Sequence, residues 1–294
     1  MSTFVLVTGA TGKQGGAVAR ALRAAGTEVH GLVRNPESAR ASALADLGVH
    51  LVEGDLDQPE TLKRALDGAR GLFSIQTPDF TDLNGDAEIR RAQRLAAAAA
   101  TAGVEQVVHT SSSNSARQID EERWSPFLAH VFRVKALAED ALREVGARST
   151  TILRPSAFME NFLPPSYFYA KGSTDRILVA YDLDVPQAFV AVDDIGSAAA
   201  AAFADPERFD SVELELASER LSFREAVATL RQVWGRPLTV AESVEEAIAE
   251  GLPEVFIHSQ TYLSARPSPA FPEYARALGV PTTSLREWAH RVRP

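Results

Sequence analysis

The sequence predicts an α/β fold: a doubly wound parallel sheet with helices on both faces, to which a smaller, discontinuous C-terminal α/β lobe is added. Two observations predict it. Strand-like apolar runs alternate with amphipathic, Ala-rich segments through the first half of the chain, and the connections between them are short. The first apolar run also ends in a glycine-rich turn that leads directly into a helix.

The glycine-rich turn follows a strand predicted at 4–7. Its glycines, Gly9, Gly12 and Gly15, have the spacing Gly-x-x-Gly-x-x-Gly. They permit a sharp turn, a close backbone approach to a pyrophosphate, and close packing of the helix on the sheet, and the helix N–H groups then face the phosphates. Lys13 would oppose the helix dipole unless an anion lay nearby. The stretch predicts a dinucleotide-binding Rossmann turn, the alternative being a glycine-rich turn without a ligand.

The residue after the second predicted strand, 28–33, indicates which dinucleotide is bound. An acidic residue there would accept hydrogen bonds from the ribose hydroxyls and would repel a 2′-phosphate. This chain has Arg34, whose guanidinium suits a phosphate dianion, and Arg40 follows within two helical turns. We therefore expect NADP(H) to be preferred over NAD(H), the alternative being that Arg34 is a solvated loop residue.

The other elements of the sheet continue the alternation. Helices are predicted at 17–25, 59–66, 86–102 and 127–145, and further strands at 49–57, 71–78, 104–109 and 150–155. A polar turn follows each of these strands, and the carboxyl ends of parallel strands lie at one edge of a sheet. We expect the turns to converge on one crevice.

After residue 155 the composition changes, and several separate segments of the chain build a second lobe. Aromatic residues crowd the segment 158–169, which is either the wall of an apolar ligand pocket or a second hydrophobic cluster. Later elements are a strand-like run at 188–196 opening a helix to 204, strands at 212–216 and 238–240, and helices at 222–234 and 244–251. We expect a dinucleotide-binding domain at 1–155 with returns near 188–205 and 238–258, and a substrate or lid domain at 156–187, 206–237 and 259–294.

Composition excludes several other classes of protein. The chain has 294 residues, of which 45% are hydrophobic and 23% charged, so it can bury a sizeable core. A net charge of -9 argues against a general nucleic-acid binder. The absence of cysteine excludes disulfides and thiol catalysis, and the histidines show no metal-ligand spacing. No signal peptide or membrane span is evident, so we expect a cytoplasmic protein without a metal site.

Five motifs together resemble the NmrA-like family, an atypical branch of the extended short-chain dehydrogenase/reductases. They are VTGATGKQGG at 7–16, VRNP at 33–36, GDLD at 54–57, ILRPSAFMENF at 152–162 and VDDIG at 192–196. The resemblance implies a Rossmann domain, a smaller C-terminal domain and a cofactor cleft between them, with Asp55 and Leu56 beside the adenine and Thr77 and Pro78 near the nicotinamide half. The cofactor-binding residues expected from motif and resemblance are Gly9, Thr11, Gly12, Lys13, Gln14, Gly15, Arg34, Asp55, Leu56, Thr77, Pro78 and Lys135.

The chain departs from the catalytic short-chain dehydrogenases at one position. Those enzymes carry Tyr-x-x-x-Lys on the helix after the fifth strand, where the tyrosine transfers the proton and the lysine holds the nicotinamide ribose. Lys135 aligns with this lysine, but Val131 stands at the tyrosine position. Valine cannot transfer a proton, and the NmrA-like family, which commonly lacks the tyrosine, divides between redox-sensing regulators and NAD(P)H-dependent reductases.

Two functions therefore remain open. In the first, the chain is an NAD(P)H-dependent oxidoreductase acting on a quinone or activated carbonyl, with Lys135 and Ser112 as catalytic residues. His130 is an alternative proton donor or a surface histidine. An apolar substrate pocket would be lined by Asn114, Phe158, Asn161 and Phe162. In the second, it is a non-catalytic NADP(H) sensor that regulates a protein partner. The aromatic segment favours the oxidoreductase. The oligomeric state is left open.

Overall fold

The computed structural model describes residues 3–77, 82, 85–115 and 124–294. The chain divides into two compact units, each assembled from separate stretches of sequence. The first unit consists of Met1–Ala116, Val131–Arg154 and Val192–Leu214, and the second of Arg117–His130, Pro155–Ala191 and Glu215–Pro294.

Within the described residues, the first unit forms around a seven-stranded sheet with strand order β10-β6-β5-β4-β1-β2-β3. The strands are β1 (Phe4–Val7), β2 (Val29–Val33), β3 (His50–Glu53), β4 (Ala69–Ser74), β5 (Gln106–Thr110), β6 (Ser149–Pro155) and β10 (Glu213–Leu216). Every pairing from β3 to β6 is parallel. The strand order reverses beside β1, which is where ligands bind in such sheets. The doubly wound parallel fold expected from the sequence is confirmed.

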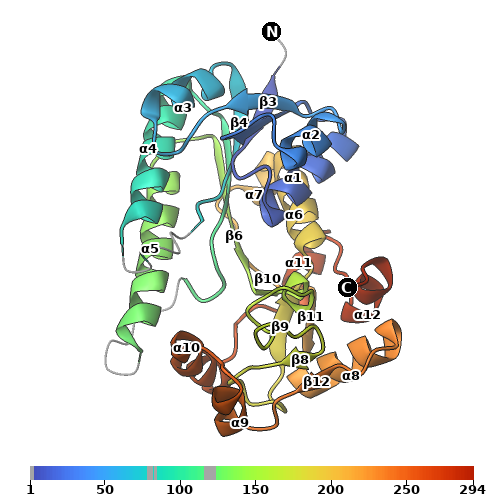
Figure 1. Ribbon diagram of the computed structural model, residues 1–294. Coiled ribbons are helices and arrows are strands. Elements are labelled where there is room, and N and C mark those ends of the chain that lie inside the picture. The colour runs from blue at the N-terminus through green and yellow to red at the C-terminus, as the bar shows by residue number, and fades with distance from the viewer. Residues whose placement is uncertain (1–2, 78–81, 83–84, 116–123) are drawn as a thin grey trace. The chain divides into compact units, whose positions relative to one another are not determined.

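Helices cover both faces of this sheet, with α3, α4 and α5 on one side and α1, α2 and α6 on the other (Figure 1). Their bounds are α1 (Lys13–Ala24), α2 (Ala39–Ala45), α3 (Pro59–Leu66), α4 (Ala87–Ala102), α5 (Pro126–Arg143), α6 (Val192–Ala204) and α7 (Pro206–Phe209). Pro59 occupies the first position of α3, and Gly103 ends α4 with a left-handed φ of 68°. The sequence analysis did not predict α2, a seven-residue helix whose first turn is capped by the Ser38 side chain.

Helices α1 and α6 pack at close range, which gives the VDDIG motif a structural reason. A Cβ built at Gly196 would lie 2.6 Å from the carbonyl oxygen of Ala17, so a larger residue would force the helices apart. Arg20 and Asp193 form an exposed ion pair of 3.0 Å between the same helices. Glycine is therefore required by packing at this point of the first unit.

The second unit combines short strands and helices. A three-stranded sheet contains β7 (Ala157–Phe158), β9 (Gln187–Val190) and β11 (Glu219–Leu221), and β8 (Arg176–Ile177) pairs with β12 (Thr239–Val240). The helices are η1 (Met159–Phe162), α8 (Phe223–Trp234), α9 (Val244–Ala249), α10 (Glu254–Ala265), α11 (Pro272–Ala277) and α12 (Leu285–Arg291). A capping box made by Ser222 and Glu225 begins α8.

The unit boundaries differ from the sequence-based ones: residues 124–130, 155, 188–191 and 238–258 fall in the second unit, and residues 206–214 fall in the first. Residues 206–214 belong to the first unit, not to the lid, because β10 extends the main sheet beside β6. Residues 238–258 belong to the second unit, because β12 pairs with β8 and not with the main sheet. Two-residue strands carry too little pattern to reveal their partners. Of the helices that the structure describes, none has both the length and the apolar character needed to cross a membrane.

Candidate active site

The glycine turn joins β1 to α1, and the backbone is tightly folded at Gly9, Gly12 and Gly15. Gly9 has a φ of +60°, and the N–H of Gly12 donates to the carbonyl of Gly9 at 2.8 Å. A Cβ at Gly15 would lie 2.3 Å from the Gly9 oxygen and 2.7 Å from the Thr8 oxygen. Any side chain at Gly15 would therefore push the helix away from the turn, whereas Gly12 is exposed and its surface is open to a ligand.

The N-terminus of α1 has the features of an anion site. Its N-cap is Gly12, which offers no side-chain cap, and the first turn contains no acidic residue. The N–H groups of the first turn are thus available, and the helix dipole adds partial positive charge. Lys13 is exposed there, while Gln14 accepts a hydrogen bond from Thr110 Oγ1 at 2.7 Å and ties the turn to the end of β5.

Thr8 fixes the segment that follows β4, a role that the sequence analysis missed. Its hydroxyl contacts the carbonyls of Phe73 and Ile75, each at 3.2 Å, and accepts from the N–H of Ile75 at 2.9 Å. The ends of β1 and β4 are held together at the switch point as a result. The exposed Thr77 follows directly, and Pro78 lies outside the described residues.

Arg34 lies at the end of β2 and is exposed. In the described part of the chain neither Arg34 nor Arg40 forms an ion pair, whereas six other arginines of the first unit do: Arg20, Arg91, Arg94, Arg143, Arg148 and Arg154. Asp55 caps its own turn, with its carboxylate accepting from the N–H of Asp57 at 2.9 Å. Leu56 packs against the core under α3. An exposed, unpaired guanidinium suits a phosphate group.

Lys135 lies on α5 and is largely buried, and its ammonium pairs with Glu88 of α4. The side chains are 13% and 8% exposed, so the two charges neutralise each other away from bulk water. Val131 lies one turn earlier on the same helix, as the sequence predicted. The sequence analysis missed Glu88, although an acid in the first turn of an Ala-rich helix was a possible signal.

Ser112 and Asn114 lie in the turn that follows β5. The hydroxyl of Ser112 is half-buried, and its bond to the carbonyl of Ser113 is long, at 3.4 Å, so it can reorient toward a ligand. Asn114 has a φ of 76°, in the left-handed region, and its buried side-chain oxygen has no hydrogen-bond partner within the described residues. Both features are typical of functional turns.

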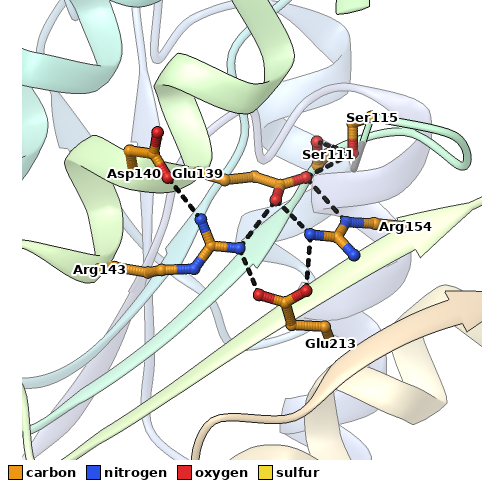
Figure 2. Close-up of polar contacts among 7 residues, drawn as sticks. All are labelled: Ser111, Ser115, Glu139, Asp140, Arg143, Arg154 and Glu213. Carbon is orange, nitrogen blue, oxygen red and sulfur yellow. Dashed lines mark hydrogen bonds and ion pairs between the residues drawn. The ribbon is translucent and has the colours of Figure 1, made fainter. Parts of the chain in front are cut away.

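A buried network of ion pairs contacts this turn through Ser115 (Figure 2). Arg154 of β6 makes a two-pronged contact with Glu139 of α5, at 3.0 and 2.6 Å, and Arg143 reaches the same carboxylate at 2.9 Å. Ser115 Oγ donates to Glu139 at 2.5 Å, and Glu213 pairs with both arginines. Burial alone would raise the pKa of Glu139, but hydrogen bonds from Arg154, Ser115 and Ser111 outweigh it and lower that pKa to about 2.

The sequence analysis did not identify this network. An arginine inside the largely buried strand β6 was one signal, since a buried guanidinium requires an acidic partner. The four-residue spacing of Lys135, Glu139 and Arg143 on one face of α5 was another.

The expected substrate-pocket residues are divided between the units: Asn114 lies in the first, and Phe158, Asn161 and Phe162 lie in the second. Phe162 is fully buried and packs against Phe168, Phe189 and Phe223 with ring centroids 5.3 to 6.0 Å apart. It belongs to the hydrophobic core, so the expectation that its ring lines a pocket is corrected. Much of the aromatic segment forms the second hydrophobic cluster that the sequence analysis kept as the alternative.

Phe158 is half-buried, and the Asn161 amide donates to Tyr167 Oη at 2.9 Å. Of the expected pocket residues in this segment, these two lie outside the aromatic core. Across the described residues, the structure contains no group of three or more His, Cys, Asp or Glu side chains that could hold a metal ion.

Comparison with known proteins identifies the family. Residues 1–264 match the model of the NmrA-like family. The chain belongs to this family. The resemblance found in the sequence motifs is thus confirmed.

Several relatives of the chain are reductases. The (4-alkanoyl-5-oxo-2,5-dihydrofuran-3-yl)methyl phosphate reductase of Streptomyces griseus is 30% identical over 97% of this chain and 96% of its own length. The NAD(P)H azoreductase of Xenophilus azovorans is 27% identical, over 91% of this chain and 88% of its own. Distant homologues are therefore NAD(P)H-dependent reductases.

Solved structures agree with the fold. The triphenylmethane reductase of Citrobacter sp., complexed with NADP(H), is 26% identical with a TM-score of 0.74 and covers 98% of this chain and 99% of its own. NmrA, a negative transcriptional regulator solved with NADP, has a TM-score of 0.76 at 20% identity, covering 99% and 96% of the two chains, and shows the shared fold. Structural neighbours bind NADP(H) or NAD.

Proposed function

We propose that the protein is an NADP(H)-dependent oxidoreductase that reduces a quinone or an activated carbonyl without a tyrosine acid. One observation carries the cofactor assignment: the uncapped, acid-free N-terminus of α1 follows β1, and the neighbouring strand β2 leads directly into Arg34, which is exposed and forms no ion pair among the residues that the structure describes. Anion-binding backbone and a free guanidinium on neighbouring strands fit a dinucleotide with a 2′-phosphate.

The chain's residues divide the work between binding and chemistry. The turn of Gly9, Thr11, Gly12 and Gly15 would hold the pyrophosphate, with Lys13 and Gln14 at its edge, and Arg34 would hold the 2′-phosphate. Asp55 and Leu56 would lie at the adenine, and Thr77, Pro78 and Lys135 toward the nicotinamide half. The bound reduced cofactor would supply the hydride.

Ser112 and Lys135 would act on the substrate oxygen. The Ser112 hydroxyl can donate a hydrogen bond to that oxygen as negative charge develops on it, and the Lys135 ammonium adds electrostatic stabilisation. Val131 supplies no proton, so the product oxygen must be weakly basic, and a hydroquinone meets this condition. Asn114, in the same unit as Ser112 and Lys135, would contact the organic part of the substrate.

A second function is favoured by the Lys135–Glu88 pair. The lysine already has a buried partner on the neighbouring helix, so it needs no substrate to balance its charge. In this alternative the chain is a non-catalytic NADP(H) sensor, whose occupied and empty forms differ in affinity for a protein partner.

Oxidation of NADPH with a panel of quinones and activated carbonyls tests the proposal, alongside calorimetric binding of NADP+ and NADPH. Turnover that is lost in Gly12→Val, and kept in the control Ala45→Val, which adds similar bulk at an exposed site of α2, would support a reductase. Tight binding without turnover on any acceptor would refute the reductase and support the sensor.

A further inference from the structure

The turn that carries Ser112 is tethered to one buried carboxylate through Ser115. The N–H of Ser111 donates to the carbonyl of Leu153 at 2.8 Å, and the N–H of Ser115 donates to the carbonyl of Ser112 at 3.1 Å. The hydroxyl of Ser111 donates to that of Ser115 at 3.3 Å, and the Ser115 hydroxyl donates to Glu139 of α5 at 2.5 Å (Figure 2). Ser112 and Asn114 lie between these two serines in the chain, so the turn that contains them is fixed to β6 at one end and to α5 at the other.

The same helix carries Lys135 one turn before Glu139. Residues four apart on a helix lie on the same face, so the ammonium and the carboxylate have a fixed separation along α5. The ion pair with Glu88 fixes the ammonium, and the bonds to Ser111 and Ser115 fix the turn. The two candidate catalytic side chains are thus positioned from one rigid element.

Stability alone gives no reason for a carboxylate at this place. Burying charges costs desolvation energy, and apolar residues of similar volume often stabilise a core as well or better. Glu139 is 2% exposed and forms a network with Arg143, Arg154 and Glu213, to which the more exposed Asp140 adds a third negative charge at Arg143. The hydrogen bonds that reach Glu139 have a fixed geometry, because they come from two arginines and from Ser115 of the turn.

We propose that Glu139 is a positioning residue that acts through Ser115 to hold Ser112 in its productive orientation relative to Lys135. The inference rests on the proposed reductase function. It also accounts for the left-handed backbone at Asn114, because an unfavourable backbone conformation persists only where surrounding contacts hold it in place.

The test uses the full-length protein and begins with Ser115→Ala, which removes the tether to the turn and leaves the ion network complete. We expect kcat for the best quinone acceptor to fall roughly tenfold, since small misplacements of a reacting group cost this much or more. The calorimetric Kd for NADPH should change less than about twofold, because the glycine turn and Arg34 are untouched. Amide hydrogen exchange at 112–115 should accelerate.

A double-mutant cycle separates positioning from general destabilisation. If Ser115 acts through Ser112, Ser115→Ala should have little further effect on kcat in a Ser112→Ala background. Glu139→Gln should resemble Ser115→Ala where it folds, and Asp140→Asn is the matched control, because Asp140 contacts Arg143 but not the turn. We expect Asp140→Asn to match the wild type.

Each outcome bears on a different claim. Equal effects of Ser115→Ala in both backgrounds, or no effect with wild-type turnover intact, would overturn the positioning role alone. Absence of turnover in the wild-type protein with every acceptor would overturn the proposed reductase, and the positioning role with it. A fall in kcat that disappears in the Ser112→Ala background would support the inference.

Discussion

His109 is a buried titratable group whose protonation should control the stability of the first unit. It lies on β5 and is 1% exposed, and its Nδ1 is 3.2 Å from the carbonyl oxygen of Ser74. Burial is the largest cause that lowers its pKa, and nearby Lys135 and Arg143 lower it further, while Glu139 and the Ser74 bond oppose them. The net result is a pKa of about 4 instead of 6.5. We consider the replacement His109→Asn, which does not titrate and whose amide can still donate toward Ser74.

The expected magnitude follows from the difference between the folded and unfolded pKa. Because the folded pKa is the lower one, the unfolded chain takes up more protons between pH 6.5 and pH 4, so the free energy of unfolding falls as the pH falls through this window. The full difference corresponds to about 3 kcal/mol, and about 2 kcal/mol of it is lost between pH 7 and pH 5. Above pH 7 the imidazole should contribute no pH dependence.

Urea unfolding at pH 7, 6 and 5 measures this loss. The wild type should lose about 2 kcal/mol more than His109→Asn over this range, whatever the absolute stability of the variant. Carboxylates contribute little above pH 5, and burial also lowers the pKa of His30, but that contribution is the same in both proteins and cancels in the comparison. Exposed His290 provides the control: His290→Asn should keep the wild-type slope.

The slope of the variant decides the outcome. Identical slopes for the wild type and His109→Asn would show that His109 is solvated or charged in the folded protein, and would refute the assignment. A direct check is the NMR titration of the His109 ring, which should stay neutral down to pH 5.

Three further perturbations test the cofactor and catalytic assignments. Arg34→Ala should weaken NADPH binding by about tenfold or more and leave NADH binding nearly unchanged, since a charged hydrogen bond to a phosphate is worth about 1.5–3 kcal/mol; equal losses for both dinucleotides, measured by calorimetry, would contradict the 2′-phosphate assignment. Gly15→Ala should reduce thermal stability and abolish cofactor binding, because its Cβ would lie 2.3 Å from the Gly9 oxygen; a normal melting temperature and normal affinity would show that the turn tolerates the side chain. Lys135→Ala should lower kcat strongly, and it should also cost stability by leaving Glu88 buried without its partner. The double variant Lys135→Ala with Glu88→Ala should therefore restore the melting temperature but not kcat. An unchanged kcat would remove Lys135 from the mechanism.

The sequence predicted the parallel sheet and the glycine turn of the first unit well because their signals are local. The turn from Gly9 to Gly15 depends on backbone space within one loop, and the structure shows that space directly. Apolar runs of four to seven residues marked the strands of the sheet, since parallel strands are buried on both faces. The capping box of α8 is equally local, because its two residues are three positions apart.

The remaining features depend on contacts between residues far apart in sequence. Glu88 meets Lys135 across 47 positions, and Thr8 meets Ile75 across 67, so neither neighbour can be read from spacing. The sequence around Phe162 is compatible with both a pocket wall and a core, because an aromatic residue in a Pro-interrupted segment occurs in either environment. Its partners Phe189 and Phe223, which decide the matter, come from later returns of the chain.

The missing tyrosine restricts the substrate more than any residue that is present. A general acid typically contributes about 10²–10⁴-fold to a rate, and Val131 cannot act as one. The Lys135 ammonium is paired with Glu88, so it stabilises a developing alkoxide less than an unpaired ammonium would, and hydrogen bonds must supply part of that stabilisation. We therefore expect quinones to be reduced at least about 100-fold faster than unactivated ketones of similar size at saturating NADPH. Comparable rates for the two classes would show that a proton donor other than Tyr operates in this site.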